Sequence, residues 1–282
     1  MLAHDLNVDL HMHSTASDGV VAPADLAVRG AANGLHLMAL TDHDTIDGLG
    51  QAEEAARDLG IEFLNGVEIS VSWGGVTLHL VGLGFDRESL ALQAGLQGVQ
   101  TSRLERARAM DDSLVKHGMP SVFDHAMSYA GNPALIGRTH FARALVAEGI
   151  CKGMQEVFDR YLTPNKPGYV PHEWARLRSA MDWIISAGGT PVLAHPARYK
   201  LTDTAHWALM QEFMQLGGRA LEVSTGSHSL DDTRRYQRLS VELGLHASRG
   251  SDFHSPTESR CDVGLAPALP DGTSPVWAGW AH

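Results

Sequence analysis

Short apolar segments alternate with amphipathic segments over most of the chain. Apolar runs of strand length occupy residues 8–10, 35–40, 61–67, 76–82, 190–196, 220–223 and 245–248. Segments with helix start and stop signals lie between them, at residues 24–33, 49–59, 181–187, 207–216 and 232–243. Strands and helices in regular succession predict right-handed crossovers between parallel strands, with functional groups at the carboxyl ends of the strands. The pattern therefore predicts an α/β fold.

The alternation stops in the middle of the chain. Residues 102–117 and 139–148 have helical patterns, and residues 129–133 have the composition of a loop. The segment 98–170 carries nine Lys/Arg and seven Asp/Glu, a net charge of +2 in a chain whose total is −11. We therefore predict three parts: the first part of a barrel at 1–96, an inserted helical subdomain that covers its mouth as a lid at 97–170, and the second part with a C-terminal tail at 171–282.

Composition and charge limit the class of protein. The 282 residues are 44% hydrophobic, enough for a sizeable core, and 22 basic against 33 acidic residues argue against binding of long nucleic acid or of an anionic membrane. No apolar run approaches the length of a membrane span, and no secretory signal pattern is present. Cys151 and Cys261 offer neither a disulfide framework nor a thiolate metal site. We expect a cytoplasmic protein with no obligate protein partner.

Imidazole and carboxylate side chains gather where the predicted strands end. His11 and His13 share a face because residues i and i+2 of a strand point the same way, and the turn after them can bring Asp18 close. A lone histidine on an apolar strand, such as His79, is more often a core residue. The series as a whole collects nine candidate metal ligands: His11, His13, Asp18, His43, Glu68, His79, His195, Asp252 and His254. Packed together, such groups require cations between them.

Nine ligands exceed the four to six that one ion takes, so two or three divalent ions are implied. Nitrogen and oxygen donors without thiolates favour Mn²⁺, Zn²⁺ or Fe²⁺. The ligands lie in the motifs His11-x-His13, Thr41-Asp42-His43-Asp44, Glu68, His79, His195-Pro196 and Gly250-Ser251-Asp252-x-His254. Over about residues 7–255 the combined pattern resembles the signature of the PHP (polymerase and histidinol phosphatase) family of metal-dependent phosphoesterases. The insertion resembles that of its small stand-alone members, which act on nucleotides and short RNA.

The resemblance implies a distorted seven-stranded β/α barrel, similar to a TIM barrel, with a trinuclear site in which Mn²⁺ is the expected metal. It divides the ligands among three ions, in the groups His11, His13, Glu68 and Asp252; Glu68, His79 and His195; and Asp18, His43 and His254. Two ions about 3.5–4 Å apart can share a hydroxide that attacks phosphorus in line. Asp18, His43 and His254 are the expected catalytic residues, because the third ion, a proton from one of these histidines or bound water neutralises the leaving oxygen. Asp9, Asp42 and Asp44 either orient the imidazoles or only form caps and turns.

Basic residues of the insertion are candidates for holding the rest of the substrate. Arg138 opens a predicted helix, so its guanidinium and the helix N-terminus could act together on an anion. The further candidates for substrate binding are Ser102, Arg103, His140, Lys166, His228 and Arg249. An acidic protein with a mildly basic lid suits a small anionic substrate better than a long polymer.

These features favour a phosphatase that acts on nucleotides, with a nucleoside 3′,5′-bisphosphate as the best single substrate because its two phosphates engage both the metals and the lid. A 5′-to-3′ exonuclease on short RNA is the first alternative, and a histidinol-phosphatase-like enzyme is the second. A non-catalytic metal-bearing scaffold module predicts lost ligands or a large attached domain, and the sequence shows neither. Activity on bisphosphate, monophosphate or trinucleotide substrates would separate these hypotheses.

Overall fold

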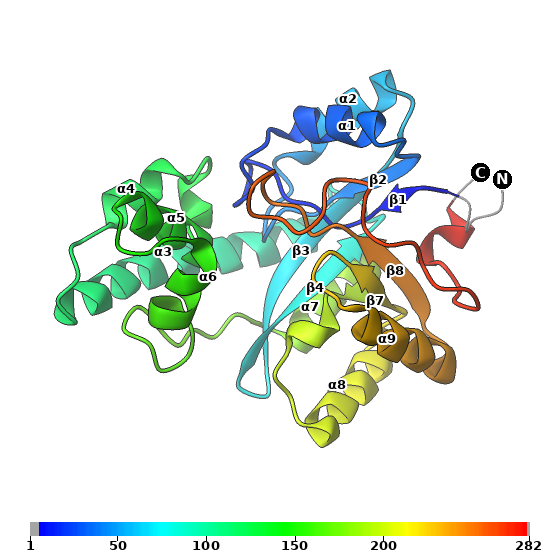
Figure 1. Cartoon of the computed structure of the whole chain (residues 1–282). Coiled ribbons are helices and arrows are strands. Elements are labelled where there is room, and N and C mark those ends of the chain that lie inside the picture. The colour runs from blue at the N-terminus through cyan, green and yellow to red at the C-terminus, as the bar shows by residue number, and fades with distance from the viewer. Residues whose placement is uncertain (1–5, 281–282) are drawn as a thin grey trace.

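The computed structural model describes residues 6–280 as a nearly closed barrel with helices outside it and a helical segment at its side (Figure 1). Seven strands pair in this order: β1 (Val8–Asp9), β2 (Leu37–Leu40), β3 (Glu62–Trp73), β4 (Val76–Leu83), β6 (Thr190–Leu193), β7 (Ala220–Thr225) and β8 (His246–Gly250). A short strand, β5 (Ala175–Arg176), pairs with the end of β3. Leu10 N donates to Arg249 O at 3.0 Å and Asp252 N donates to His11 O at 2.8 Å, which brings the first and last strands together. The predicted seven-stranded α/β barrel is confirmed.

Helices cover the outer face of the barrel. They are α1 (Pro23–Ala32), α2 (Leu49–Asp58), α7 (Leu177–Ser186), α8 (Asp203–Gln215) and α9 (Leu230–Leu243). Proline at the start of α1 fits a position that has no intrahelical bond to lose, and a Ser229 and Asp232 capping box opens α9. The largest core cluster lies between these helices and the outward side chains of the strands, such as Met38, Ile69 and Leu221.

The inside of the barrel is apolar at one end and polar at the other. One face of β4 presents His79, Val81 and Leu83 in turn, because alternate side chains of a strand point the same way. Val81 and Leu83 join an interior cluster that includes Trp277, from the short C-terminal helix η5 (Val276–Gly279). Glu68 also points inward, from β3. The apolar end is thus closed by packing, and the polar end remains for chemistry.

The prediction of parallel strands throughout is wrong for β4. This strand runs antiparallel to both β3 and β6, so that His79 pairs with Ser70 in the register. The cause is the Gly74-Gly75 turn, in which both residues have positive φ (56° and 80°), a conformation that suits a two-residue hairpin. A turn of this length cannot carry a crossover to a parallel neighbour. The prediction placed Glu68 after the end of its strand, but in the structure it lies within the long strand β3.

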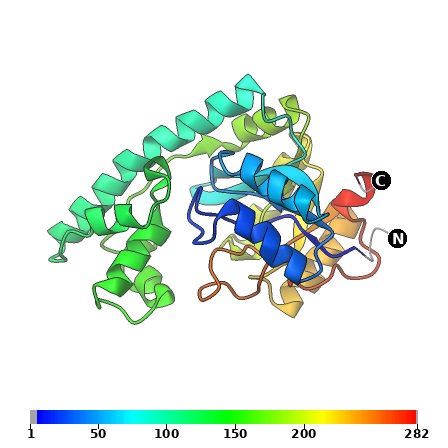
Figure 2. The same cartoon turned by 90° about the horizontal axis from the view of Figure 1, so that it is seen from above.

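A helical segment with its own core lies beside the barrel, and we call residues 97–170 the inserted segment. It contains most of α3 (Leu90–Lys116), with α4 (Phe123–Ser128), α5 (Arg138–Ala147) and α6 (Met154–Val157), and the short helices η2 (Pro133–Leu135) and η3 (Phe158–Leu162). Figure 2 shows α3 as a long arm between the two parts. Leu92 and Leu96 of α3 pack in the barrel core, whereas Met110 and Leu114 pack in the second core. The exact boundaries of the three parts stay a prediction, because α3 crosses residue 97 without a break.

No helix within residues 6–280 combines the length and the apolar character that crossing a bilayer requires.

Candidate active site

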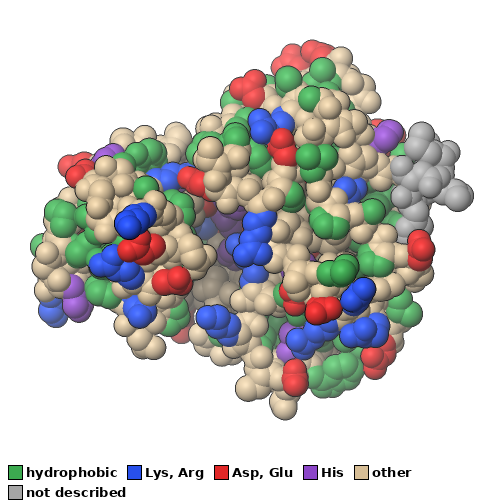
Figure 3. Space-filling model, viewed as in Figure 1, with side chains coloured by type: hydrophobic (Ala, Val, Ile, Leu, Met, Phe, Trp, Pro, Cys, Tyr) green, Lys and Arg blue, Asp and Glu red, His purple; other side chains and the backbone are tan. Residues whose placement is uncertain are grey.

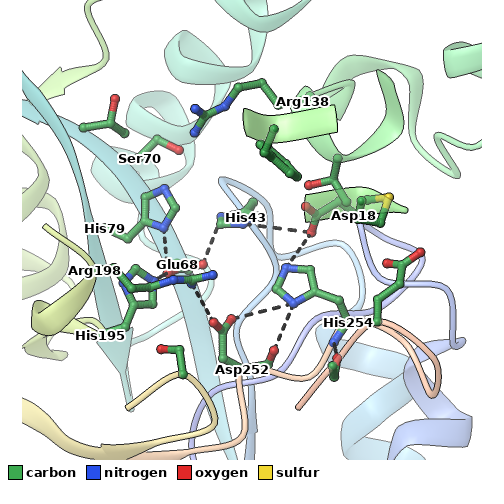
Figure 4. A pocket seen from close by; sticks show the side chains of 18 of the residues that line it. Asp18, His43, Glu68, Ser70, His79, Arg138, His195, Arg198, Asp252 and His254 are labelled. Carbon is green, nitrogen blue, oxygen red and sulfur yellow. Dashed lines mark hydrogen bonds and ion pairs between the residues drawn. The ribbon is translucent and has the colours of Figure 1, made fainter. Parts of the chain in front are cut away.

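The nine predicted ligands meet at the polar end of the barrel. Seven of them line a cleft of about 830 Å³ between the barrel and the inserted segment. His11 and His13 lie directly behind them, with no exposed surface, and their ring centroids are 5.1 Å apart. Figure 4 shows the labelled histidine and carboxylate side chains of the cleft turned toward one another, and in Figure 3 histidine is visible at the bottom of the hollow. Residues spread over most of the sequence thus form one cluster.

Glu68 lies at the centre of this cluster. Its Oε1 atom is 2.9 Å from Nδ1 of His79 and 2.9 Å from Nε2 of His195. Its Oε2 atom is 3.0 Å from Nδ1 of His43 and 3.3 Å from Nε2 of His13. A carboxylate whose two oxygens face different imidazoles has the arrangement of a bridging metal ligand.

Two further groups flank Glu68. Asp252 Oδ1 lies 3.3 Å from Nε2 of His13 and 3.6 Å from Nε2 of His11. On the cleft side, Asp18 Oδ1 lies 3.3 Å from Nε2 of His254 and 3.9 Å from Nε2 of His43. Ligand atoms of His13, Asp18, His43 and His254 all fall within 4.8 Å of one another, as do those of His43, Glu68 and His79. Several overlapping metal-sized sets are present rather than one.

Strand ends and tight loops bring these side chains together. His11 and His13 follow β1 and His43 follows β2, while His195 follows β6 and Asp252 follows β8. The approach of β8 to the first loop requires glycine at position 250, since a Cβ there would lie 2.2 Å from Cβ of His11.

Buried polar atoms of the cluster indicate that its donors fit divalent cations. Buried nitrogen or oxygen atoms of seven ligands make no hydrogen bond of good geometry within residues 6–280, although several lie at ion-pair distance from another ligand: His11 Nε2, both ring nitrogens of His13, Asp18 Oδ1, His43 Nδ1, Glu68 Oε2, His79 Nδ1 and His195 Nδ1. A buried polar atom without a partner costs free energy, so atoms gathered at one point indicate a missing partner. Imidazole nitrogens and carboxylate oxygens are the ligands that Mn²⁺, Zn²⁺ and Fe²⁺ accept.

The pKa values of Asp18, Glu68 and Asp252 in the cluster lie well below their usual range. Burial disfavours the charge on Asp252, but Arg198 and His11 outweigh it and hold the pKa of that carboxyl well below its usual range. Burial likewise opposes the charge on Glu68, and His79 with His11 and His43 keeps its pKa low. Burial lowers the pKa of His13 to about 3, which keeps its imidazole neutral. Anionic carboxylates and the neutral imidazole of His13 are forms that bind a cation. Burial opposes the charge on His254, but Asp18 outweighs it and raises the pKa of that imidazole to about 9, so a cation bound there would displace its proton.

Glu222, which the sequence interpretation missed, supports two of the ligands from behind. It lies on β7, is buried, and its Oε1 atom is 2.6 Å from Nδ1 of His11. Its Oε2 atom accepts a hydrogen bond from the backbone N–H of His195, whose φ of 26° is strained for a residue with a side chain. A carboxylate on Nδ1 of a histidine leaves Nε2 for a metal. In the sequence, Glu222 was marked only as a single acidic residue within an otherwise apolar predicted strand.

Three further aspartates near the cluster accept hydrogen bonds from groups other than the imidazoles: Asp9, Asp42 and Asp44. Asp42 accepts hydrogen bonds from Ser14 and Ser17, which shape the turn that carries Asp18. Asp9 accepts from Ser251 N and Gly264 N, and Asp44 accepts from Ser70 and Arg103. They fix loops and strand contacts, so turn formation is the interpretation that the structure supports.

The opposite wall of the cleft carries cations. Arg103, Arg106 and Arg138 come from the inserted segment and line the cleft. Arg103 is engaged with Asp44 and lies over Trp174, 4.8 Å from the ring centroid. Arg138 has no hydrogen bond or ion pair within residues 6–280. Burial, with repulsion from Arg138 and Arg103, lowers the pKa of Arg106 to about 9.

Arg106 and Arg138, which pair with no carboxylate within residues 6–280, form a site suited to an anion. The sequence interpretation selected Arg103 and Arg138 but missed Arg106 and Arg198. A basic residue in a helix carries no signal of which way it faces until the helix is placed.

The other five substrate-binding candidates do not line the cleft. Ser102 donates to Val99 O, and Lys166 is exposed in a loop. His140 is buried and accepts from Gly137 N at the start of α5, and His228 is stacked on Tyr236. Arg249 donates to Ala266 O and Asn7 on the far side of β8. The contacts of Ser102, His140 and Arg249 lie within α3, at the start of α5 and in loops of the barrel, rather than in the cleft.

A model of the PHP domain matches residues 9–225. The chain belongs to the PHP family. The match includes seven of the nine candidate ligands, and it confirms the resemblance that the motifs predicted.

Curated relatives of this PHP protein cover nearly the whole chain. It is 51% identical over 271 residues to a 3′,5′-nucleoside bisphosphate phosphatase of Chromobacterium violaceum, with 96% of this chain and 95% of that protein covered. It is 40% identical to a 5′-3′ exoribonuclease of Haemophilus influenzae, with 95% and 97% covered.

One solved structure, from Chromobacterium violaceum, is described as an amidohydrolase with bound sulfate and no metal. It superposes on this chain with a TM-score of 0.94 at 50% identity, and the superposition covers 97% of this chain and 95% of that one. A predicted metal-dependent phosphoesterase of Bifidobacterium adolescentis superposes with a TM-score of 0.81 at 25% identity, covering 96% and 93%. The PHP barrel and its helical segment therefore recur together in these proteins.

Proposed function

We propose that this protein is a metal-dependent phosphoesterase that removes one phosphate from a nucleoside 3′,5′-bisphosphate and leaves the 5′-monophosphate. The observation that carries the proposal is that Arg138, which pairs with no carboxylate of residues 6–280, lines the same cleft as the imidazole and carboxylate cluster. A substrate with two phosphates places one at each wall. The relative from Chromobacterium violaceum bears the name of this activity.

We propose the following division of the ligands. His11, His13, Glu68 and Asp252 hold one ion, Glu68 with His79 and His195 holds a second, and Asp18, His43 and His254 hold a third. When bound, divalent ions supply Lewis acidity toward the phosphoryl oxygens and toward water. The unpartnered buried atoms of the cluster support this assignment.

The chain's own residues then bind, orient and shield the substrate. Arg138 and Arg106 hold the phosphate that is not cleaved, and a guanidinium pair fits phosphate oxygens in a fixed orientation. Asp18, His43 and His254 act on the side of the leaving oxygen, and their side chains keep 11%, 14% and 19% exposure. The inserted segment, residues 97–170, acts as a lid over the cleft and keeps bulk water from the reacting phosphate.

Exoribonuclease activity on short RNA is the second candidate. Lys200 and Arg260 also line the cleft, and Arg260 is exposed, so cations continue from the centre toward the surface. A chain of several phosphates could follow them. The 40% identity to the exoribonuclease of Haemophilus influenzae supports this alternative.

One set of assays separates the candidates. Purified protein with Mn²⁺ is given adenosine 3′,5′-bisphosphate, AMP, histidinol phosphate and a 5′-phosphorylated trinucleotide, and the release of phosphate and of mononucleotide is measured. We expect the highest kcat/KM on the bisphosphate. Preference for the trinucleotide would select the exoribonuclease, and preference for histidinol phosphate the histidinol phosphatase. Metal binding without turnover of any substrate would favour the scaffold module.

Manganese as the ion used in the cell, and the cytoplasm as the location, are further parts of the proposal. The donor set without thiolates supports manganese, but it also accepts zinc or iron. Metal analysis of the protein purified without added metal tests this point.

A further inference from the structure

A second arginine of helix α5 joins the inserted segment to the barrel. Arg143 is 7% exposed, and its Nη1 donates to the backbone oxygen of Asp18 at 2.8 Å. Its Nε and Nη2 donate to the two carboxylate oxygens of Glu258 at 3.1 and 2.8 Å. One buried guanidinium therefore makes three hydrogen bonds to two separate loops of the barrel.

Both loops carry candidate ligands of the same group. The first loop, residues 14–19, holds Asp18, whose carboxylate faces His254. The second loop, residues 254–259, begins at His254 and folds back so that Ser259 Oγ accepts from the backbone N–H of His254 at 2.7 Å. Neither loop contains a helix or a strand. Their separation is therefore held by individual contacts rather than by a sheet register.

The inserted segment contacts the first loop at a second point. A Cβ on Gly131 would lie 2.3 Å from the backbone oxygen of Thr15, so these two backbones pack directly. Arg138 and Arg143 are part of the same helix, and docking through Arg143 therefore also fixes where the first turn of α5 meets the cleft. A bidentate guanidinium and carboxylate pair fixes orientation as well as distance.

We propose that Arg143 is a positioning residue through which the inserted segment holds Asp18 and His254 in their ligand geometry. The insertion is then more than a cover, since it completes the group Asp18, His43 and His254. The part of this inference that concerns metal occupancy rests on the proposed function. The part that concerns the two loops does not.

The first test measures the loops without metal. Hydrogen exchange is compared in the wild type, Arg143→Met, Arg143→Lys, Glu258→Gln and the control Arg160→Met. Arg160 also lies in the inserted segment and pairs with Glu156 at 2.7 Å, but it is exposed and pairs within that segment. We expect exchange in peptides 14–20 and 254–260 to become about tenfold faster in Arg143→Met, with a smaller change in Arg143→Lys and Glu258→Gln. Exchange across β4 should not change.

The second test measures metal and turnover. Equilibrium dialysis with Mn²⁺ should show one ion per chain lost or bound about tenfold more weakly in Arg143→Met, and none lost in Arg160→Met. The kcat of Arg143→Lys should recover at high Mn²⁺, whereas a general packing defect would not respond to metal.

The inference would be overturned if peptides 14–20 and 254–260 exchanged hydrogen no faster in Arg143→Met and Arg143→Lys than in Arg160→Met. If Arg143→Met does not fold, Arg143→Lys and Glu258→Gln decide the matter by the same measurement. Wild-type protein that binds no Mn²⁺ and hydrolyses no phosphate ester would refute the proposed function, while the loop exchange would still decide the role of Arg143.

Discussion

The two walls of the cleft are built in different ways. The barrel wall carries imidazoles and carboxylates from strands and from the loops that follow them, each in contact with several others, and Arg198 pairs with Asp252 at its edge. The wall from the inserted segment consists of guanidiniums on helices, of which Arg138 has no ion pair within residues 6–280. The first wall offers groups of donors that could hold cations, and the second is suited to binding an anion. We infer that the first wall determines the reaction and the second the substrate.

The largest expected effect is on the barrel wall. Asp252→Asn keeps the shape of the side chain but removes a negative charge that faces His11 and His13. We expect kcat on adenosine 3′,5′-bisphosphate to fall by about 10³ or more, because metal-assisted stabilisation of the transition state is lost. Steady-state kinetics with Mn²⁺ measure it, and Asp271→Asn in the exposed tail is the matched control. Turnover within a few-fold of the wild type would refute the assignment of Asp252.

The next effect is on the opposite wall. Arg138→Ala removes a guanidinium that forms no ion pair in the described part of the chain, and it removes no candidate ligand. We expect KM for the bisphosphate to rise by about 10–100-fold, as for the loss of charged hydrogen bonds worth about 1.5–3 kcal/mol, with kcat nearly retained. Arg108→Ala, in which the lost side chain lies over Phe123 instead, is the control. An equal fall of kcat in both Asp252→Asn and Arg138→Ala would contradict the division between the walls.

A smaller effect is expected behind the barrel wall. Glu222→Gln retains the size of the side chain, but an amide cannot accept hydrogen bonds at both ends from His11 and from the backbone of His195. We expect about tenfold weaker Mn²⁺ binding, as is typical when the partner of a ligand histidine is changed, and activity restored by added Mn²⁺. Calorimetric titration measures the affinity. Unchanged binding would show that Glu222 only fills space.

The smallest effect on catalysis is expected at the apolar end of the barrel. Trp277→Ala opens a cavity among Val81, Leu83 and Val192, and should lower the free energy of unfolding by about 3–5 kcal/mol. The kcat and KM of the folded variant should not change, because the ligands are at the other end. Urea unfolding followed by fluorescence measures the stability. A large fall in kcat at 25 °C would mean that the two ends of the barrel are coupled.

The sequence determined the members of the barrel wall more fully than their arrangement. Spaced motifs indicated nine side chains that the structure places together, and alternating apolar segments indicated the α/β barrel. The antiparallel course of β4 was missed although the Gly74-Gly75 turn signalled it. Glu222 was missed because a single acidic residue on a strand has no local pattern to mark it.

Contacts between distant segments were decided only by the tertiary structure. The side chains of Arg103, Arg106 and Arg138 reach the cleft, and Arg249 turns away from it, although all four are arginines in a plausible local context. The chain itself sets residue types and local periodicity, which is enough to collect metal donors at strand ends. Which way a long cationic side chain points depends on how helices dock, and that follows from packing between residues far apart in the sequence.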